Sequence, residues 1–191
     1  MQRVLHMQRS ADSSFRKLLL LSVFIFLFGL FAGLFFSIGL SEENTDRLSS
    51  SLISSMTDMS IGGFRIFMSA LFSDLTTAAL MLAAALSKLL CFLPFAVLWY
   101  ESFAIGFCCG LIHLVSTENA IALSLTEILP PAIFFIPSFI ILAAAATACS
   151  KNEILKSKRP SREGKSLIVL ISGSLVAIVI GCAIEALCCS F

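Results

Sequence analysis

The most constraining feature of the sequence is the stretch from Leu89 to Cys149, which has 61 residues and contains no lysine or arginine. Its only acidic residues are Glu101, Glu118 and Glu127. Read with the 3.6-residue period of a helix, the stretch has no polar face, which excludes a surface helix of a soluble domain. A helix that spans a membrane takes roughly 20 residues, so this stretch is long enough to cross a bilayer twice. We therefore expect an integral membrane protein surrounded by lipid.

The composition of the whole chain agrees with this interpretation. Hydrophobic residues make up 58% and charged residues 13% of the sequence, whereas an average soluble domain has about 25% charged residues. The net charge is +1, and no array of basic and aromatic residues predicts nucleic-acid binding. The seven cysteines lie mostly in apolar runs and suggest neither a disulfide framework nor a metal site. We expect no metal and no other cofactor.

We predict an all-α protein with a single membrane domain of about five transmembrane helices. These are expected at residues 18–40, 69–88, 89–115, 120–149 and 167–188. The first span is too long for the apolar core of a cleavable signal peptide and is read as an uncleaved anchor. The fourth should be kinked near Pro130, Pro131 and Pro137, because proline cannot donate the helical hydrogen bond and clashes with the preceding turn.

The hydrophilic segments predict how the chain is oriented in the membrane. Residues 1–17 form a basic tail and residues 150–166 a basic loop. With the N-terminus in the cytoplasm, eleven basic residues fall on the inner side and two on the outer side. Such a bias in short loops follows the positive-inside rule. The C-terminus is then expected outside the cytoplasm.

Residues 41–68 are predicted to form an amphipathic segment on the outer side. Leu48, Leu52, Met56 and Met59 fall on one helical stripe, with serine, threonine and aspartate on the other faces. Such a helix lies on a membrane surface or against a partner. It can equally be a lid packed on the protein's own membrane helices, and the sequence leaves both alternatives open.

Small residues recur at intervals of four in several spans and predict close contacts between helices. Small residues let helix backbones approach closely, which favours helix association in lipid. We therefore interpret these positions as helix-packing or partner-binding residues. They are Gly29 and Gly33 in the first span, Gly106 and Gly110 in the third, and Gly173, Ala177 and Gly181 in the last.

The polar residues within the spans allow two interpretations. They are Lys88, Glu101, Glu127 and Glu185, and ionisable residues inside a membrane are functional candidates. The acids form either a proton or cation path or a polar link at a helix kink. A small transporter or permease subunit using Glu101 and Glu127 is therefore an alternative, although the sequence has no repeat of the kind that transporters carry. No nucleophile–base set, phosphate-binding glycine loop or metalloprotease motif is present, so we do not expect an enzyme.

Two motifs carry a family resemblance. The run from Glu101 to Gly110, followed by the run from Leu129 to Pro137, resembles the stage II sporulation protein M family. The Ala-Ile-Glu-Ala run at residues 183–186 is similar as well. The likeness covers nearly the whole chain. In this sequence Ser102 stands where the family usually has glycine, and Pro131 and Phe135 replace residues that are often polar.

The resemblance implies a non-enzymatic scaffold in the bacterial cell membrane. Proteins of this family sit in the septal membrane during sporulation. They hold stage II sporulation proteins D and P, which degrade peptidoglycan in septal thinning and engulfment. We expect the small-residue stripes to bind the membrane anchor of such a partner and residues 41–68 to contact its outer part. A homo-oligomer is a further arrangement that the small-residue stripes allow.

Overall fold

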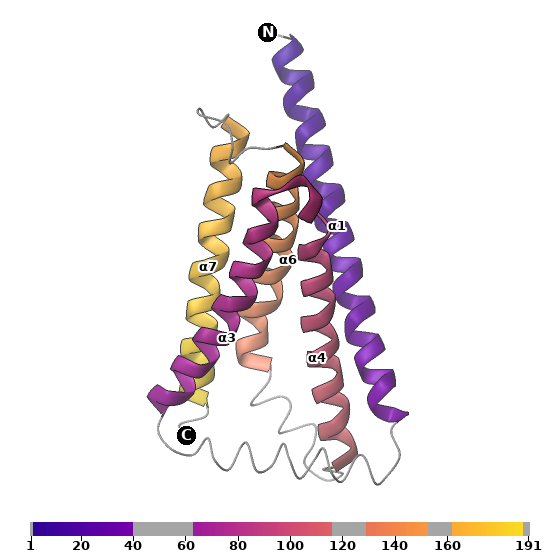
Figure 1. The fold of residues 1–191 in the computed structure, drawn as a ribbon, viewed down its shortest axis with the longest axis vertical. Helices are drawn as coiled ribbons and strands as arrows, with labels where there is room; N and C mark the ends of the chain where they lie inside the picture. The colour runs from indigo at the N-terminus through magenta and orange to yellow at the C-terminus, as the bar shows by residue number, and fades with distance from the viewer. Residues whose placement is uncertain (1, 40–62, 116–128, 153–161, 189–191) are drawn as a thin grey trace.

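The computed structural model describes residues 2–39, 63–115, 129–152 and 162–188, and within these ranges it contains helices and no strands (Figure 1). The α-helices are α1 (Gln2–Ile38), α3 (Gly63–Ala83), α4 (Leu93–Val115), α6 (Leu129–Asn152) and α7 (Arg162–Cys188). Successive α-helices run in opposite directions along one bundle (Figure 1). The start of α1 and the end of α7 consequently lie at opposite ends of the molecule.

Four helices in the described ranges are long and apolar enough to cross a membrane. The apolar stretches are Ser14–Ile38, Leu93–Leu111, Ala132–Lys151 and Gly164–Ile184. Helix α3 contains a shorter apolar stretch, Leu71–Ala83. Beyond Ala83 the chain continues in two short 3₁₀ helices, Ala84–Leu86 and Lys88–Leu90, and not in the regular helix expected up to residue 88. The all-α membrane class is confirmed, and α3 is the shortest of the five apolar α-helices in the described residues.

The three prolines of α6 do not act alike. Pro130 and Pro131 fall in the first turn of the helix, and only Pro137 lies in its interior. Proline is tolerated in a first turn because the N–H groups there have no helical partner. The kink predicted near Pro130 and Pro131 stays a prediction, because the described helix begins at Leu129. At Pro137 the carbonyl of Ile133 loses its usual i+4 donor.

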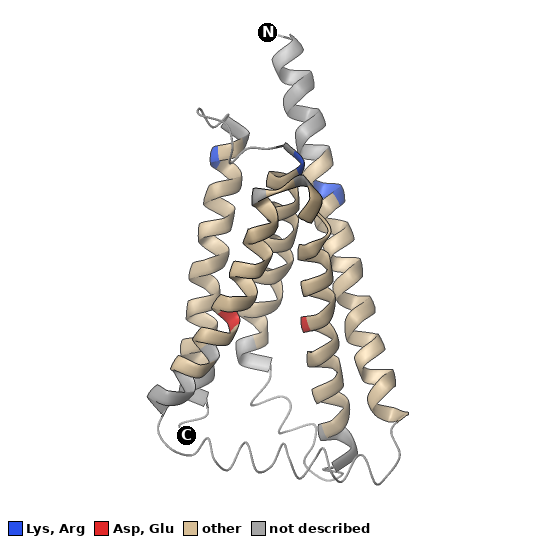
Figure 2. Ribbon diagram, in the orientation of Figure 1, with Lys and Arg blue, Asp and Glu red and all other residues tan. Residues whose placement is uncertain are grey.

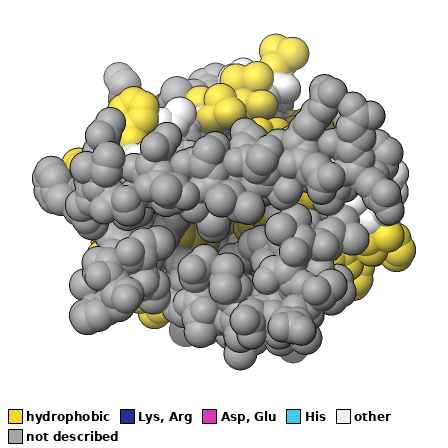
Figure 3. All heavy atoms as spheres, turned by 90° about the horizontal axis from the view of Figure 1, so that it is seen from below, with side chains coloured by type: hydrophobic (Ala, Val, Ile, Leu, Met, Phe, Trp, Pro, Cys, Tyr) yellow, Lys and Arg dark blue, Asp and Glu magenta, His cyan; other side chains and the backbone are white. Residues whose placement is uncertain are grey.

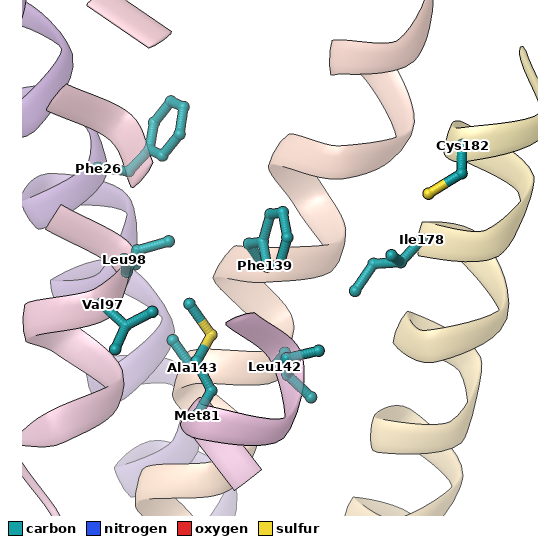
Figure 4. Close-up of a cluster of buried hydrophobic side chains, with 10 residues drawn as sticks. Phe26, Met81, Val97, Leu98, Phe139, Leu142, Ala143, Ile178 and Cys182 are labelled. Carbon is teal, nitrogen blue, oxygen red and sulfur yellow. The ribbon is translucent and has the colours of Figure 1, made fainter. Parts of the chain in front are cut away.

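The core of the bundle is built around α6. Every residue of this helix from Leu142 to Ser150 is buried, and four of them are consecutive alanines, Ala143 to Ala146. Alanine lets neighbouring helices come close. Figure 4 shows side chains from all five described α-helices meeting near the start of this stretch, among them Phe26, Met81, Leu98 and Ile178. The fully buried stretch of α6 is thus built mostly of small side chains.

The outside of the bundle is apolar. Phe24, Phe28 and Phe35 on α1 and Phe72 on α3 are at least 60% exposed. The view from below shows hydrophobic side chains around the rim and no charged side chain of the described residues (Figure 3). An apolar outer surface over a small-residue core is what lipid surroundings require. Two predicted features lie outside the described residues. They are the amphipathic stripe of Leu48, Leu52, Met56 and Met59, and the intramembrane acid Glu127.

Candidate functional site

The closest helix contact in the described part of the chain joins α1 to α4, and two glycines of α1 form one half of it. A Cβ atom added at Gly29 would lie 2.8 Å from the carbonyl oxygen of Trp99. One added at Gly33 would lie 2.7 Å from the backbone nitrogen of Phe107. Real Cβ atoms do not approach backbone atoms so closely. Both positions therefore require glycine, because the backbone of α4 occupies the space of a side chain.

The other half of this contact comes from two glycines of α4. A Cβ at Gly106 would lie 2.9 Å from the carbonyl carbon of Leu30, and one at Gly110 would lie 2.8 Å from the Cβ of Ser37. The two G-x-x-x-G motifs predicted from the sequence thus face each other across one contact, which we call the α1–α4 seam (Gly29, Gly33, Gly106, Gly110). Mutual backbone approach of this kind is a principal source of helix association in lipid.

Small polar and aromatic side chains complete the α1–α4 seam. Ser102 is fully buried beside Gly29 and donates a hydrogen bond to the carbonyl of Trp99 at 2.9 Å. Ser37 donates to the carbonyl of Leu34 at 2.7 Å. The ring centroids of Phe36 and Phe103 lie 5.9 Å apart. This aromatic pair adds further contact between the two helices. Ser102 therefore fits the seam with its hydroxyl hydrogen-bonded.

The small residues of α7 divide into two environments. Gly181 is buried, and a Cβ there would lie 2.8 Å from the ring of Phe135 on α6. At Gly173 no neighbouring heavy atom comes within 4 Å of an added Cβ. Gly173 and Ala177 instead line an apolar groove of about 260 Å³ between α6 and α7, which Phe134, Pro137 and Val169 also line. The small-residue stripe of α7 looks uniform in the sequence. In the structure, a neighbouring side chain packs against its Gly181 end, whereas its Gly173 end faces open space.

Polar side chains link α3 to two neighbouring helices. The hydroxyl of Thr77 donates to Oε1 of Glu101 on α4 at 2.9 Å. The thiol of Cys182 on α7 donates to Oδ2 of Asp74 at 3.4 Å. The sequence predicts Glu101 as a candidate, but it predicts neither its partner Thr77 nor the contact between Asp74 and Cys182. Asp74 and Thr77 are three residues apart, and residues at this spacing are neighbours on a helix surface. This spacing is the sequence signal that could have identified both as polar contact residues of α3.

A further polar contact ties the turn after α3 to the central helix. Ser150 on α6 donates to the carbonyl of Ser87, between the two 3₁₀ helices, at 2.8 Å. Lys88 lies in the second 3₁₀ helix and Glu185 near the end of α7, but the side chains of both lie outside the described part of the structure. No group of three histidine, cysteine or acidic side chains within the described ranges is arranged to hold a metal ion.

The described charges are separated along the bundle. The ribbon colours show the described basic residues at one end of the bundle and the described acidic residues farther along the helices (Figure 2). The described basic residues are Arg16, Lys17, Lys151 and Lys165. The basic end comprises the beginning of the apolar stretch of α1, the end of α6 and the start of α7. Segments that are distant in the sequence thus form one basic rim.

Comparison with known proteins identifies one family. The family model described as Stage II sporulation protein M matches residues 22–189, which is nearly the whole chain. The match begins within α1 and covers all of α3, α4, α6 and α7. No curated protein and no solved structure matches the chain.

Proposed function

We propose that the chain, which belongs to the stage II sporulation protein M family, acts as a membrane scaffold for peptidoglycan-degrading enzymes. The family is one of sporulation membrane proteins, and the observation that carries the proposal is the match over residues 22–189. The partners in this proposal are stage II sporulation proteins D and P, held at the septal membrane during thinning and engulfment. The scaffold itself cleaves no bond.

The polar contacts of the bundle support a structural role for its membrane acids. Glu101 accepts a hydrogen bond from Thr77 on α3, and Asp74 accepts one from Cys182 on α7. Hydrogen bonds of this kind hold membrane helices together. This use of Glu101 favours the polar-link interpretation over the alternative of a transporter or permease subunit.

The separation of charge supports the proposed orientation. Arg16, Lys17, Lys151 and Lys165 lie at one end of the bundle (Figure 2), and clustered basic residues favour the cytoplasmic side. With this end in the cytoplasm, the end of α7 points away from the cytoplasm. The end of α1 and the start of α3 then lie on the side of the cell wall and its enzymes.

The proposal is tested by photo-crosslinking in native membranes of the sporulating host. A photoreactive phenylalanine analogue replaces an outward-facing residue, Phe28 or Phe72, which are 60% and 77% exposed. The matched controls carry it at Leu98 or Leu142, which are fully buried. We expect an exposed position to capture a membrane-anchored peptidoglycan hydrolase and the buried positions to capture none.

Affinity purification of the unmodified full chain provides the second readout. We expect a peptidoglycan hydrolase to co-purify with the chain from sporulating cells. The control is an unrelated multi-pass protein of the same membrane, with which no hydrolase should co-purify. If neither crosslinking nor purification recovers a hydrolase, the scaffold proposal is wrong. Digestion of cell wall by the purified chain alone would also contradict it.

A further inference from the structure

The basic rim of the bundle lies where the membrane-spanning stretches end. It consists of the basic residues whose side chains are described, which are exposed and come from three helices at one end of the bundle (Figure 2): Arg16, Lys17, Lys151 and Lys165. Each of them is among the first four or the last four residues of an apolar stretch long enough to cross a membrane. The ends of such a stretch lie at the boundary between acyl chains and headgroups. The four charges are therefore placed at the depth of the lipid phosphates.

A buried apolar cluster fixes the three helix ends around this rim. The cluster includes buried residues of every helix that carries a rim charge, among them Leu18, Cys149 and Leu167. Each of these three lies one or two residues from a basic residue of the rim. Because they pack in one cluster, the ends of α1, α6 and α7 cannot separate without exposing it. The charges are thus held together by the fold, although they are distant in the sequence.

The positive charge of this end is not balanced by the acidic residues near it. The two acids whose side chains are described, Asp74 and Glu101, lie farther along the bundle (Figure 2). In the sequence, residues 1–17 and 150–166 together contain ten basic and three acidic residues, an excess of seven positive charges. Clustered basic residues at the membrane surface attract anionic lipids. The rim therefore has a net charge that lipid phosphates complement.

The turn between α3 and α4 indicates that the surroundings of the rim are lipid. Ser87 in this turn accepts a hydrogen bond at 2.8 Å from Ser150, the residue before Lys151. In the same turn Leu89 is 93% exposed and Phe92 is 73% exposed. Large apolar side chains are stabilised among acyl chains and destabilised in water. A soluble anion would match the rim alone, whereas a phospholipid offers a phosphate to the rim and an acyl chain to the turn.

We propose that the basic rim (Arg16, Lys17, Lys151, Lys165) binds the phosphates of anionic phospholipids and selects these lipids over zwitterionic ones. In a zwitterionic headgroup the lipid's own ammonium offsets the phosphate charge, so the rim gains less from binding it. Long basic side chains keep their stems on apolar surface while their charged ends reach the headgroups. The positive-inside rule concerns only the side on which such charges lie. Selection of anionic lipid does not depend on the recruitment of hydrolases.

Quenching of tryptophan fluorescence by brominated lipids tests this selection at the two ends of α1 separately. Trp99→Phe removes the only tryptophan, and a new one is introduced as Leu20→Trp near the rim or as Phe35→Trp near the other end. The two positions are matched in exposure, at 68% and 70%. The full chain is reconstituted in phosphatidylcholine vesicles with increasing brominated phosphatidylglycerol or brominated phosphatidylcholine.

We expect the two reporters to differ. At Leu20→Trp, brominated phosphatidylglycerol should bind about fivefold or more tightly than brominated phosphatidylcholine. At Phe35→Trp the two lipids should quench about equally. The preference at Leu20→Trp should also fall as salt is added, because charges at the surface are screened.

Two variants of the rim make the result specific. The neutral variant combines Arg16→Gln, Lys17→Gln, Lys151→Gln and Lys165→Gln, and it should lower the preference to about one. The matched control combines Arg16→Lys, Lys17→Arg, Lys151→Arg and Lys165→Arg, which keeps every charge and should keep the preference. Because all four side chains are exposed, both variants are expected to fold, and circular dichroism checks this.

Three results would overturn the inference. The first is equal quenching by the two lipids at Leu20→Trp, and the second is a preference that the folded neutral variant retains. The third is a preference abolished by soluble glycerol phosphate at constant ionic strength, which would mean that the rim takes a free anion. If the neutral variant does not fold, Lys151→Gln with Lys165→Gln replaces it, and an unchanged preference in this pair would contradict the inference as well.

Discussion

The α1–α4 seam and the α6–α7 contact use the same small residues in different ways. In the seam, Gly29, Gly33 and Gly106 face backbone atoms of the opposite helix, which cannot move aside. Gly110 faces the side chain of Ser37. Between α6 and α7, Gly181 faces a phenylalanine ring and Gly173 faces a groove. The consequence of a glycine therefore depends on whether backbone, side chain or open space lies opposite. Substitutions at each kind of position test this comparison.

The largest effect is expected at the α1–α4 seam. Gly106→Leu forces the side chain into the backbone of Leu30, which has to move as part of α1. Overpacking typically costs about 1–3 kcal/mol and sometimes more, and we expect at least the upper end here. Thermal unfolding in detergent, followed by circular dichroism, measures the loss. A Gly106→Leu variant as stable as the parent would show that the seam is looser than described.

An intermediate loss of stability is expected at Gly181, because the atoms opposite belong to the ring of Phe135, a side chain that can shift. Gly181→Ala should lower the free energy of unfolding by about 1 kcal/mol. The double variant with Phe135→Leu should recover part of the loss, since the smaller side chain leaves room for the added methyl group. Additive losses in this double-mutant cycle would mean that the two residues do not interact.

The polar link of α3 should contribute less than the glycine seam. Glu101→Gln keeps an oxygen that accepts the Thr77 hydrogen bond, whereas Glu101→Leu removes it. We expect Glu101→Gln to be nearly neutral and Glu101→Leu to cost about 1 kcal/mol of unfolding free energy. Ion flux across proteoliposomes is the discriminating measurement: flux in the parent that disappears in Glu101→Gln would support the transporter interpretation.

The smallest effect on stability is expected at Gly173. Gly173→Leu places its side chain in open space, so the free energy of unfolding should change by less than about 0.5 kcal/mol. The same detergent unfolding assay compares it directly with Gly106→Leu. A large destabilisation would show that the α6–α7 groove is filled by the chain itself.

Much of the architecture follows from the sequence because lipid imposes strict conditions. Long runs without charge have to become helices in a membrane, since every backbone group needs a partner inside its own segment. This condition predicts α1, α4, α6 and α7 from residue order alone. It predicts α3 less well, because the regular helix ends at Ala83 and the chain continues in two 3₁₀ helices. Pro130 and Pro131 fall in the first turn of α6, a position that tolerates proline, so the kink expected there stays a prediction.

The sequence by itself determined that this chain is an all-α membrane protein of the stage II sporulation protein M family, and which helix faces carry small residues. Only the tertiary structure decided what each face meets. Gly29 and Gly106 lie 77 residues apart in the sequence yet belong to one seam, and Cys182 reaches Asp74 across 108 residues. Helical periodicity describes one helix at a time, whereas contacts in lipid depend on which helices become neighbours. For this reason Gly173 and Gly181, two positions on one stripe, have opposite surroundings.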